Sequence, residues 1–256
     1  VSANHLISAS FMSAPAALAV SKLFYPSDTH VRKKVNIKDI ARPGTGLVDA
    51  ATTGAVAAIG VVSHILVTVI AFISLLAFVN ATLEWFGERV GLVPPYYPQL
   101  TFQLICSYLL WPVVFLIGVP MQDCQVVARM LGIKIFINEF IAYSDLGHVR
   151  ANRVALESHV ANNGTWRLAD FGDGMELLGT NTTLVGGVIL PRSEMLATYA
   201  LCGFSDLVAL GIMSAALSTV APVRRHDILQ VAPRALISGV VACLLTAAMA
   251  GLVAEA

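Results

Sequence analysis

The sequence predicts an all-α integral membrane protein that combines transmembrane helices with a re-entrant helical hairpin and a broken helix. Of its 256 residues, 57% are hydrophobic and 12% are charged, whereas soluble domains carry about 25% charged residues. Long apolar runs lie at 55–79, 195–220 and 235–253, and a helix needs roughly 20 apolar residues to cross a bilayer. Carboxylates and glycines inside apolar segments indicate where the backbone folds back or breaks.

The charge and the cysteine pattern argue against several classes of function. The net charge is zero, so no bulk electrostatic attraction to nucleic acid is expected. The four cysteines are far apart in apolar segments and form no CxxC pair, which predicts neither a disulfide framework nor a zinc site. No HExxH motif or Cys–His cluster is present, so the sequence does not predict an enzyme, a metal site or a cofactor.

The first elements are simple apolar helices. Residues 1–24 form a segment rich in small residues, typical of closely packed membrane helices. A long span at 50–82 ends in a stretch with aromatic residues that suit a membrane interface. Residues 99–119 are apolar but interrupted by Pro112, which predicts an interfacial helix.

The basic residues predict the orientation. The connectors 22–42 and 224–234 hold nine of the sixteen Lys and Arg residues and should be cytoplasmic. The polar loop 144–192 is then external. It carries two N-x-T triplets, at Asn163 and Asn181, as glycosylation candidates.

Residues 121–143 are bracketed by external regions and must therefore enter and leave the membrane on one side. A re-entrant hairpin does this, and its irregular backbone is tolerated only where it lines a cavity enclosed by protein. Glu139 is expected near its tip. A carboxylate in the membrane is functional by default, although a structural ion pair with Lys134 or Arg129 is the alternative.

The segment 194–220 has Gly203, Ser205 and Asp206 at its middle. Glycine and polar residues at mid-span predict a broken helix whose freed backbone groups face a site, although Asp206 could instead form an internal salt bridge. The last span is predicted at 234–253. A hairpin tip facing a broken helix predicts a transporter site.

The stretch "GIKIFINEFIAY" resembles the signature of the concentrative nucleoside transporters. The matching residues are Gly132, Lys134, Asn138, Glu139, Phe140, Ala142 and Tyr143. The stretches "SASFMSAPAALAVSKLFYP", "EWFG", "PQLTFQLICSYL" and "ATYALCGF" are similar to animal members of this family, in the same order.

This resemblance implies a sodium-coupled nucleoside symporter that works by alternating access, as a homotrimer in the plasma membrane. Its fold consists of inverted repeats. Residues 1–24 would end the preceding repeat, and 25–256 would be the C-terminal domain, so the chain corresponds to the C-terminal half and should not transport alone. The coupling Na⁺ would bind in the missing N-terminal half, and no cofactor is implied. The expected partners are nucleosides, membrane lipids and further copies, with no nucleic acid.

The resemblance also implies the binding residues. Glu139 would accept hydrogen bonds from the ribose hydroxyls and Phe204 would lie near the substrate, with Asn138, Ser205 and Asp206 beside them. Family members typically read Gly-Phe-Ala-Asn-x-x-Ser where this chain reads "GFSDLVA". The changes leave open a transport-deficient or altered-specificity paralogue, acting as a membrane scaffold or receptor, or a proton-coupled carrier. If Asp206 and Glu139 face one cavity, the two carboxylates repel, and a protonated Asp206 could donate a hydrogen bond as Asn does.

The predicted topology is testable by labelling. A cysteine placed at Gly164 should react with a membrane-impermeant thiol reagent in intact cells, because the 144–192 loop is expected outside. Labelling only after permeabilisation would overturn both the orientation and the hairpin.

Overall fold

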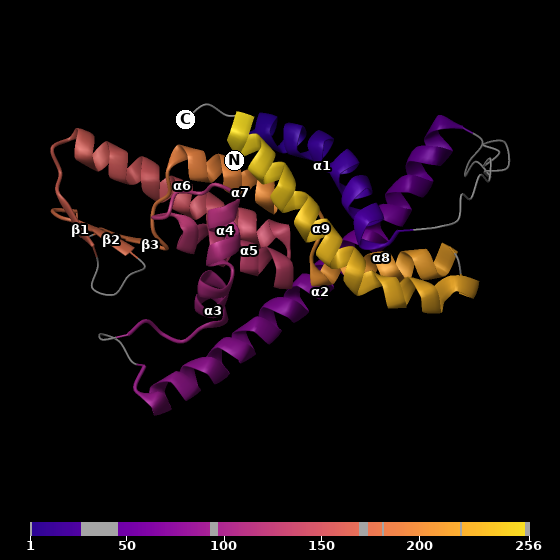
Figure 1. Cartoon of the computed structure of the whole chain (residues 1–256), viewed down its shortest axis with the longest axis horizontal. Helices are drawn as coiled ribbons and strands as arrows, with labels where there is room; N and C mark the ends of the chain where they lie inside the picture. The colour runs from indigo at the N-terminus through magenta and orange to yellow at the C-terminus, as the bar shows by residue number, and fades with distance from the viewer. Residues whose placement is uncertain are drawn as a thin grey trace.

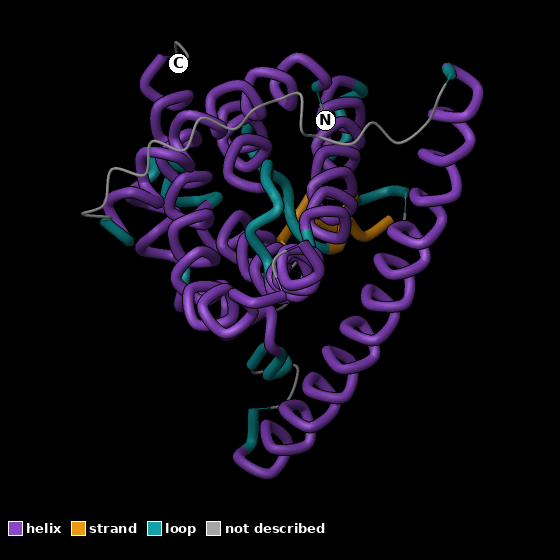
Figure 2. Tube along the Cα trace, turned by 90° about the vertical axis from the view of Figure 1, so that its right-hand side faces the viewer, coloured by secondary structure: helices purple, strands orange, loops and turns teal. Residues whose placement is uncertain are grey.

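The computed structural model describes residues 2–26, 46–92, 97–168, 174–180, 182–220 and 222–253. Over these residues the chain is mostly helical, with one small antiparallel sheet inserted between helices α6 and α7 (Figure 1). Helix α9 packs against α1, α7 and α8, and α5 packs against α3, α6 and α7. The long helix α2 runs along the outside of the molecule (Figure 2).

The long apolar helices are α1 (Ala3–Phe24), α2 (Leu47–Val90) and α9 (Arg225–Val253). In the described part of the chain, α1, α9 and the second half of α2, from Val69, are long and apolar enough to cross a membrane. Many large apolar side chains of α2 are exposed, as expected of a helix that faces lipid rather than water. The protein is therefore an integral membrane protein.

The residues after α2 form two short helices instead of the single interfacial helix predicted at 99–119. They are α3 (Phe102–Leu109) and α4 (Trp111–Leu116). Pro112 lies in the first turn of α4. Because proline has no backbone N–H to donate to the preceding turn, it is tolerated at a helix start and ends the helix before it.

Helix α5 (Cys124–Phe136) and helix α6 (Glu139–Ala161) are the two arms of a helical hairpin in the region, 121–143, where a re-entrant hairpin was predicted. The second arm continues well beyond Tyr143, so the expectation of a loop beginning at residue 144 was wrong. The sequence of this part is polar, which favoured a loop. Its side chains are nevertheless used in the fold: Asp145 pairs with Arg129 on α5 at 3.3 Å.

The predicted all-α class was also wrong in one respect. Strands β1 (Trp166–Leu168), β2 (Gly174–Leu177) and β3 (Thr182–Val185) form an antiparallel sheet in the order β1-β2-β3. Each strand is at most four residues long. Strands this short carry too little alternation of apolar and polar residues to be recognised from sequence.

Three side chains of the hairpin bind the last residue of the sheet and the segment that follows it. Arg129 donates to the Gly186 carbonyl at 3.1 Å, and Asn152 donates to the carbonyls of Val185 and Gly187 at 2.8 and 3.0 Å. Arg153 donates to the Ile189 carbonyl at 3.2 Å. These bonds fix the chain that returns from the sheet against α5 and α6.

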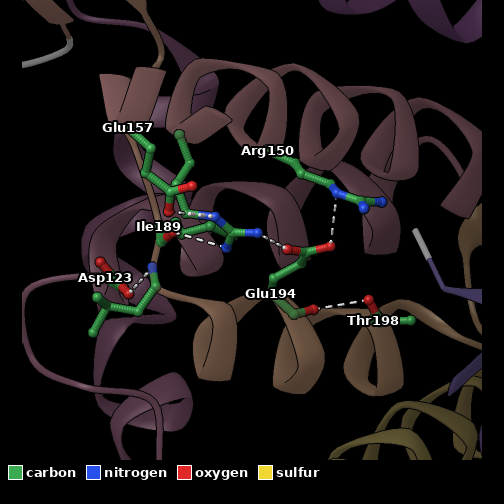
Figure 3. A network of polar contacts seen from close by, with 8 residues as sticks. Asp123, Arg150, Glu157, Ile189, Glu194 and Thr198 are labelled. Carbon is green, nitrogen blue, oxygen red and sulfur yellow. Dashed lines mark hydrogen bonds and ion pairs between the residues drawn. The ribbon is translucent and has the colours of Figure 1, made fainter. Parts of the chain in front are cut away.

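Helix α7 (Pro191–Leu201) begins at this fastened segment. Its start is bound by Asp123, which accepts hydrogen bonds from the Leu190 N–H at 2.9 Å and the Ser193 hydroxyl at 2.5 Å. Glu194 lies between two arginines of α6 and binds Arg153 at 2.5 Å and Arg150 at 3.4 Å (Figure 3). The position of α7 is therefore fixed by both hairpin arms.

The interruption expected in the 194–220 segment lies between Leu201 and Leu207, where helix α8 (Leu207–Val220) begins. Gly203 occupies the left-handed region, with φ +118°, and a Cβ there would lie 2.8 Å from the Cys243 sulfur. Only glycine meets both demands easily. A 3₁₀ turn (Pro222–Arg224) then leads into α9.

The fold changes the design of the labelling experiment. A Cβ at Gly164 would lie 2.3 Å from the His159 imidazole, so a cysteine there would disturb the turn. Asn162 is exposed and next to Asn163, and Asn162→Cys should be labelled from outside intact cells. Asn163 is itself exposed, with φ +60°, whereas Asn181 lies outside the described residues.

Candidate functional site

The turn between α5 and α6 meets the break between α7 and α8 at one cavity of about 240 Å³. The two segments are far apart in the sequence, and the cavity joins residues from both. It is lined by Asn138, Glu139, Phe140, Phe204, Asp206, Val208, Ala209, Ile212 and Met213. The structure thus brings together four of the five predicted substrate-binding residues.

Two helix N-termini open onto this cavity. The Asn138 side chain caps α6 by accepting from the Ile141 N–H at 3.0 Å, and Asp206 caps α8 by accepting from the Ala209 N–H at 2.6 Å. Asn and Asp are favoured at this position because their oxygens satisfy amides that the helix leaves free. The positive ends of both helix dipoles therefore face the same space.

Glu139, the first residue of α6, is only 6% exposed. Neither of its carboxylate oxygens has a hydrogen-bond partner among the described residues. A buried carboxylate without partners is rare and costly. It is therefore ready to accept hydrogen bonds from a ligand.

The alternative of a structural ion pair for Glu139 is not what the structure shows. The Lys134 ammonium group is fully buried and donates to the Ala200 carbonyl at 2.9 Å, while Arg129 pairs with Asp145. Neither cation is bonded to Glu139 in the described part of the chain. Asp206 likewise uses its carboxylate as a helix cap.

Lys134 and Tyr143 have a role that the sequence did not reveal. Lys134 donates to the Ala200 carbonyl, and the Tyr143 hydroxyl donates to the Thr198 carbonyl at 2.8 Å. Both carbonyls lie in the last turn of α7, where a helix leaves its carbonyls without partners. The hairpin thus supplies hydrogen-bond donors to carbonyls that the break in the helix leaves without backbone partners. The sequence pattern marked both residues but not these partners.

The other motif residues differ in their surroundings: two small ones lie at close contacts or in the core, and Phe140 lies at the cavity. A Cβ on Gly132 would lie 2.4 Å from the Cys106 Cβ, so only glycine permits this approach of α5 to α3. Ala142 is fully buried in the core. Phe140 is 57% exposed and lies at the cavity.

Phe204 and Ser205 differ in where they point. Phe204 is 74% exposed and lines both this cavity and a larger one between α8 and α9. Ser205 is buried, with its hydroxyl 3.6 Å from the Cys243 sulfur. Of these two cavities it lines the larger and not the one that contains Glu139.

Comparisons with known proteins show the family of the chain. Residues 5–251 match the family model described as "Na+ dependent nucleoside transporter C-terminus". The chain belongs to this family. Its resemblance to the concentrative nucleoside transporters is thereby confirmed, and the family is one of transporters rather than enzymes.

Relatives of known name include the "Sodium/nucleoside cotransporter 1" of Mus musculus, which is 40% identical over 98% of this chain and 35% of that protein. The "Solute carrier family 28 member 3" of Rattus norvegicus is 41% identical over 100% of the chain and 33% of its own length. The chain therefore spans about a third of these relatives.

Solved structures share the fold. CNTnw in an inward-facing substrate-bound state has a TM-score of 0.75 and 26% identity, over 98% of this chain and 51% of its own. A CNTnw variant in an outward-facing state has a TM-score of 0.77, with the same identity and coverage. The transporter fold is thus similar over nearly the whole chain.

Removing the Tyr143 hydroxyl tests how the hairpin holds the break. Tyr143→Phe leaves the Thr198 carbonyl without its donor, and a typical hydrogen bond contributes about 0.5–1.5 kcal/mol. The Tm of the purified protein in detergent should fall by about 2–4 °C for each kcal/mol of unfolding free energy lost. Tyr108→Phe, at an exposed tyrosine, is the matched control, and equal Tm values for the two variants would contradict the role.

Proposed function

We propose that the chain forms the nucleoside-binding half of a sodium-coupled importer. The observation that carries this proposal is the buried Glu139 carboxylate, whose two oxygens have no partner among the described residues and line a cavity. Membership of the sodium-dependent nucleoside transporter family supports it.

The chemistry of a nucleoside fits this cavity. Ribose hydroxyls donate hydrogen bonds, and an ionised carboxylate only accepts them. The exposed rings of Phe140 and Phe204 at the same cavity offer apolar faces against which a flat base can pack. Asn138 uses its side-chain oxygen on α6, so its amide N–H groups are the part that can donate to a substrate.

The transport cycle proposed is alternating access. CNTnw has been solved in inward-facing and outward-facing states, with a fold similar to this chain. We place the Na⁺ site in the part of the transporter that precedes this chain. The re-entrant insertion of α5 and α6, the inverted repeat, a homotrimeric assembly and a plasma-membrane location belong to the same proposal.

Sodium-dependent uptake is the direct test. Cells that express the complete transporter should accumulate a labelled nucleoside, such as uridine or inosine, from a sodium medium but not from a choline medium. A protein that reaches the cell surface and shows no uptake of either nucleoside would favour a scaffold or receptor instead.

Glu139→Gln tests the binding role. The amide keeps the size of the side chain but loses charge-assisted hydrogen bonds, each of which contributes about 1.5–3 kcal/mol. The apparent affinity for nucleoside should therefore fall by roughly tenfold or more, with normal surface expression.

Glu157→Gln is the matched control, because Glu157 lies on the same helix, is 65% exposed and forms a 3.7 Å ion pair with Arg153. It should leave uptake unchanged. Parallel loss of folded protein and uptake in Glu139→Gln would instead assign Glu139 a structural role.

A further inference from the structure

Two buried carboxylates line the cavity at the break, and the buried Lys134 lies on α5 four residues before Asn138. Lys134 is fully buried, and Glu139 and Asp206 are 6% and 2% exposed. Lys134 interacts electrostatically with both carboxylates. If all three were ionised, one positive charge would face two negative charges, and one negative charge would stay uncompensated in a buried site.

The two carboxylates differ in the hydrogen-bond donors that the protein gives them. Asp206 accepts a hydrogen bond from the Ala209 N–H at the start of α8, which stabilises its ionised form. Glu139 has no donor among the described residues. Of the two carboxylates, Glu139 is therefore the one whose charged form the protein stabilises less.

We propose that Glu139 and Asp206 share one proton, and that nucleoside binds to this singly protonated pair. The inference rests on the proposed function. Two carboxylates in a confined site do not both ionise easily, and one keeps a proton. One proton makes the buried group with Lys134 electrically neutral. A proton needs only the two carboxylates, and the described residues hold no group of three His, Cys, Asp or Glu that could hold a metal ion.

The proton can move within the pair when nucleoside binds. Ribose hydroxyls that donate to Glu139 favour its ionised form, and the proton then passes to Oδ2 of Asp206, the oxygen that does not accept from the Ala209 N–H. A protonated Asp206 keeps its cap through the first oxygen and donates with the second, much as an asparagine would. The proton leaves Glu139 and binds Asp206, so the pair holds one proton and carries one negative charge before and after this transfer.

Other titratable groups near the pair are engaged elsewhere. Tyr143 donates to Thr198, and the Cys243 thiol donates to the Cys202 carbonyl at 3.0 Å. Arg224 and Asp227 lie at the larger cavity that Asp206 also lines; both are exposed. That cavity, of about 530 Å³, gives Asp206 a second route to water for proton exchange.

The experiment measures nucleoside affinity from pH 5.5 to 8.5 at constant sodium, using the complete transporter in cells. Wild-type affinity should weaken as the pH rises, by at most about tenfold per pH unit, because one proton is lost. Asp206→Asn removes the second carboxylate but keeps the cap, so its affinity should be independent of pH. Asp227→Asn makes the same change at the exposed position and should follow the wild-type profile.

Parallel profiles for wild type and Asp206→Asn would overturn the shared proton while leaving nucleoside transport intact. Absence of uptake at every pH would instead refute the proposed function. Thermal unfolding of the purified protein would then test whether Glu139 and Asp206 share a proton. A folded state that binds an extra proton loses stability as the pH rises. The wild-type Tm should therefore fall relative to Asp206→Asn between pH 6 and 8.5, and a constant difference would refute the pair.

Discussion

The rest of the structure depends on how α5 holds α7 at both ends. Asp123, just before α5, binds the start of α7 through Leu190 and Ser193, and Lys134, near the end of α5, binds the Ala200 carbonyl. The contacts advance in the same direction along both helices, so the helices are parallel and their register is fixed. Because both bonds involve buried charged groups, a shift of either helix would leave a charge without a partner.

This register determines what happens at the break. With its last carbonyls bound by the hairpin, α7 ends without needing α8 to continue it, and the chain can turn at Gly203. Helix α8 then begins with Asp206 as its cap, close to the point where α6 begins with Asn138. The cavity is the space between these two helix starts, and Glu139 is left there without a protein donor. A buried carboxylate without a donor lowers the stability of the fold, but it offers a ligand an acceptor for hydrogen bonds.

The small sheet is attached to the same unit rather than to the long apolar helices. Arg129, Asn152 and Arg153 bind the carbonyls that follow it, and Arg153 also binds Glu194 on α7. The hairpin therefore holds both the end of the sheet and α7. The long helix α2 contacts α3 through Asn80, whose side chain binds Phe102 and Gln103, and α3 in turn packs against α5.

The sequence by itself determined the membrane class, because composition and apolar run length depend on no contact. It also located the hairpin, the break and the motif containing Glu139, since a carboxylate or glycine in an apolar run departs from its local surroundings. Only the tertiary structure decided that residues 144–161 are helical and that a sheet follows, because the polar side chains there find their partners in α5 and α7. It alone gave Lys134 and Tyr143 their carbonyl partners and placed Ser205 at the larger cavity, since these contacts join residues that lie far apart in the chain.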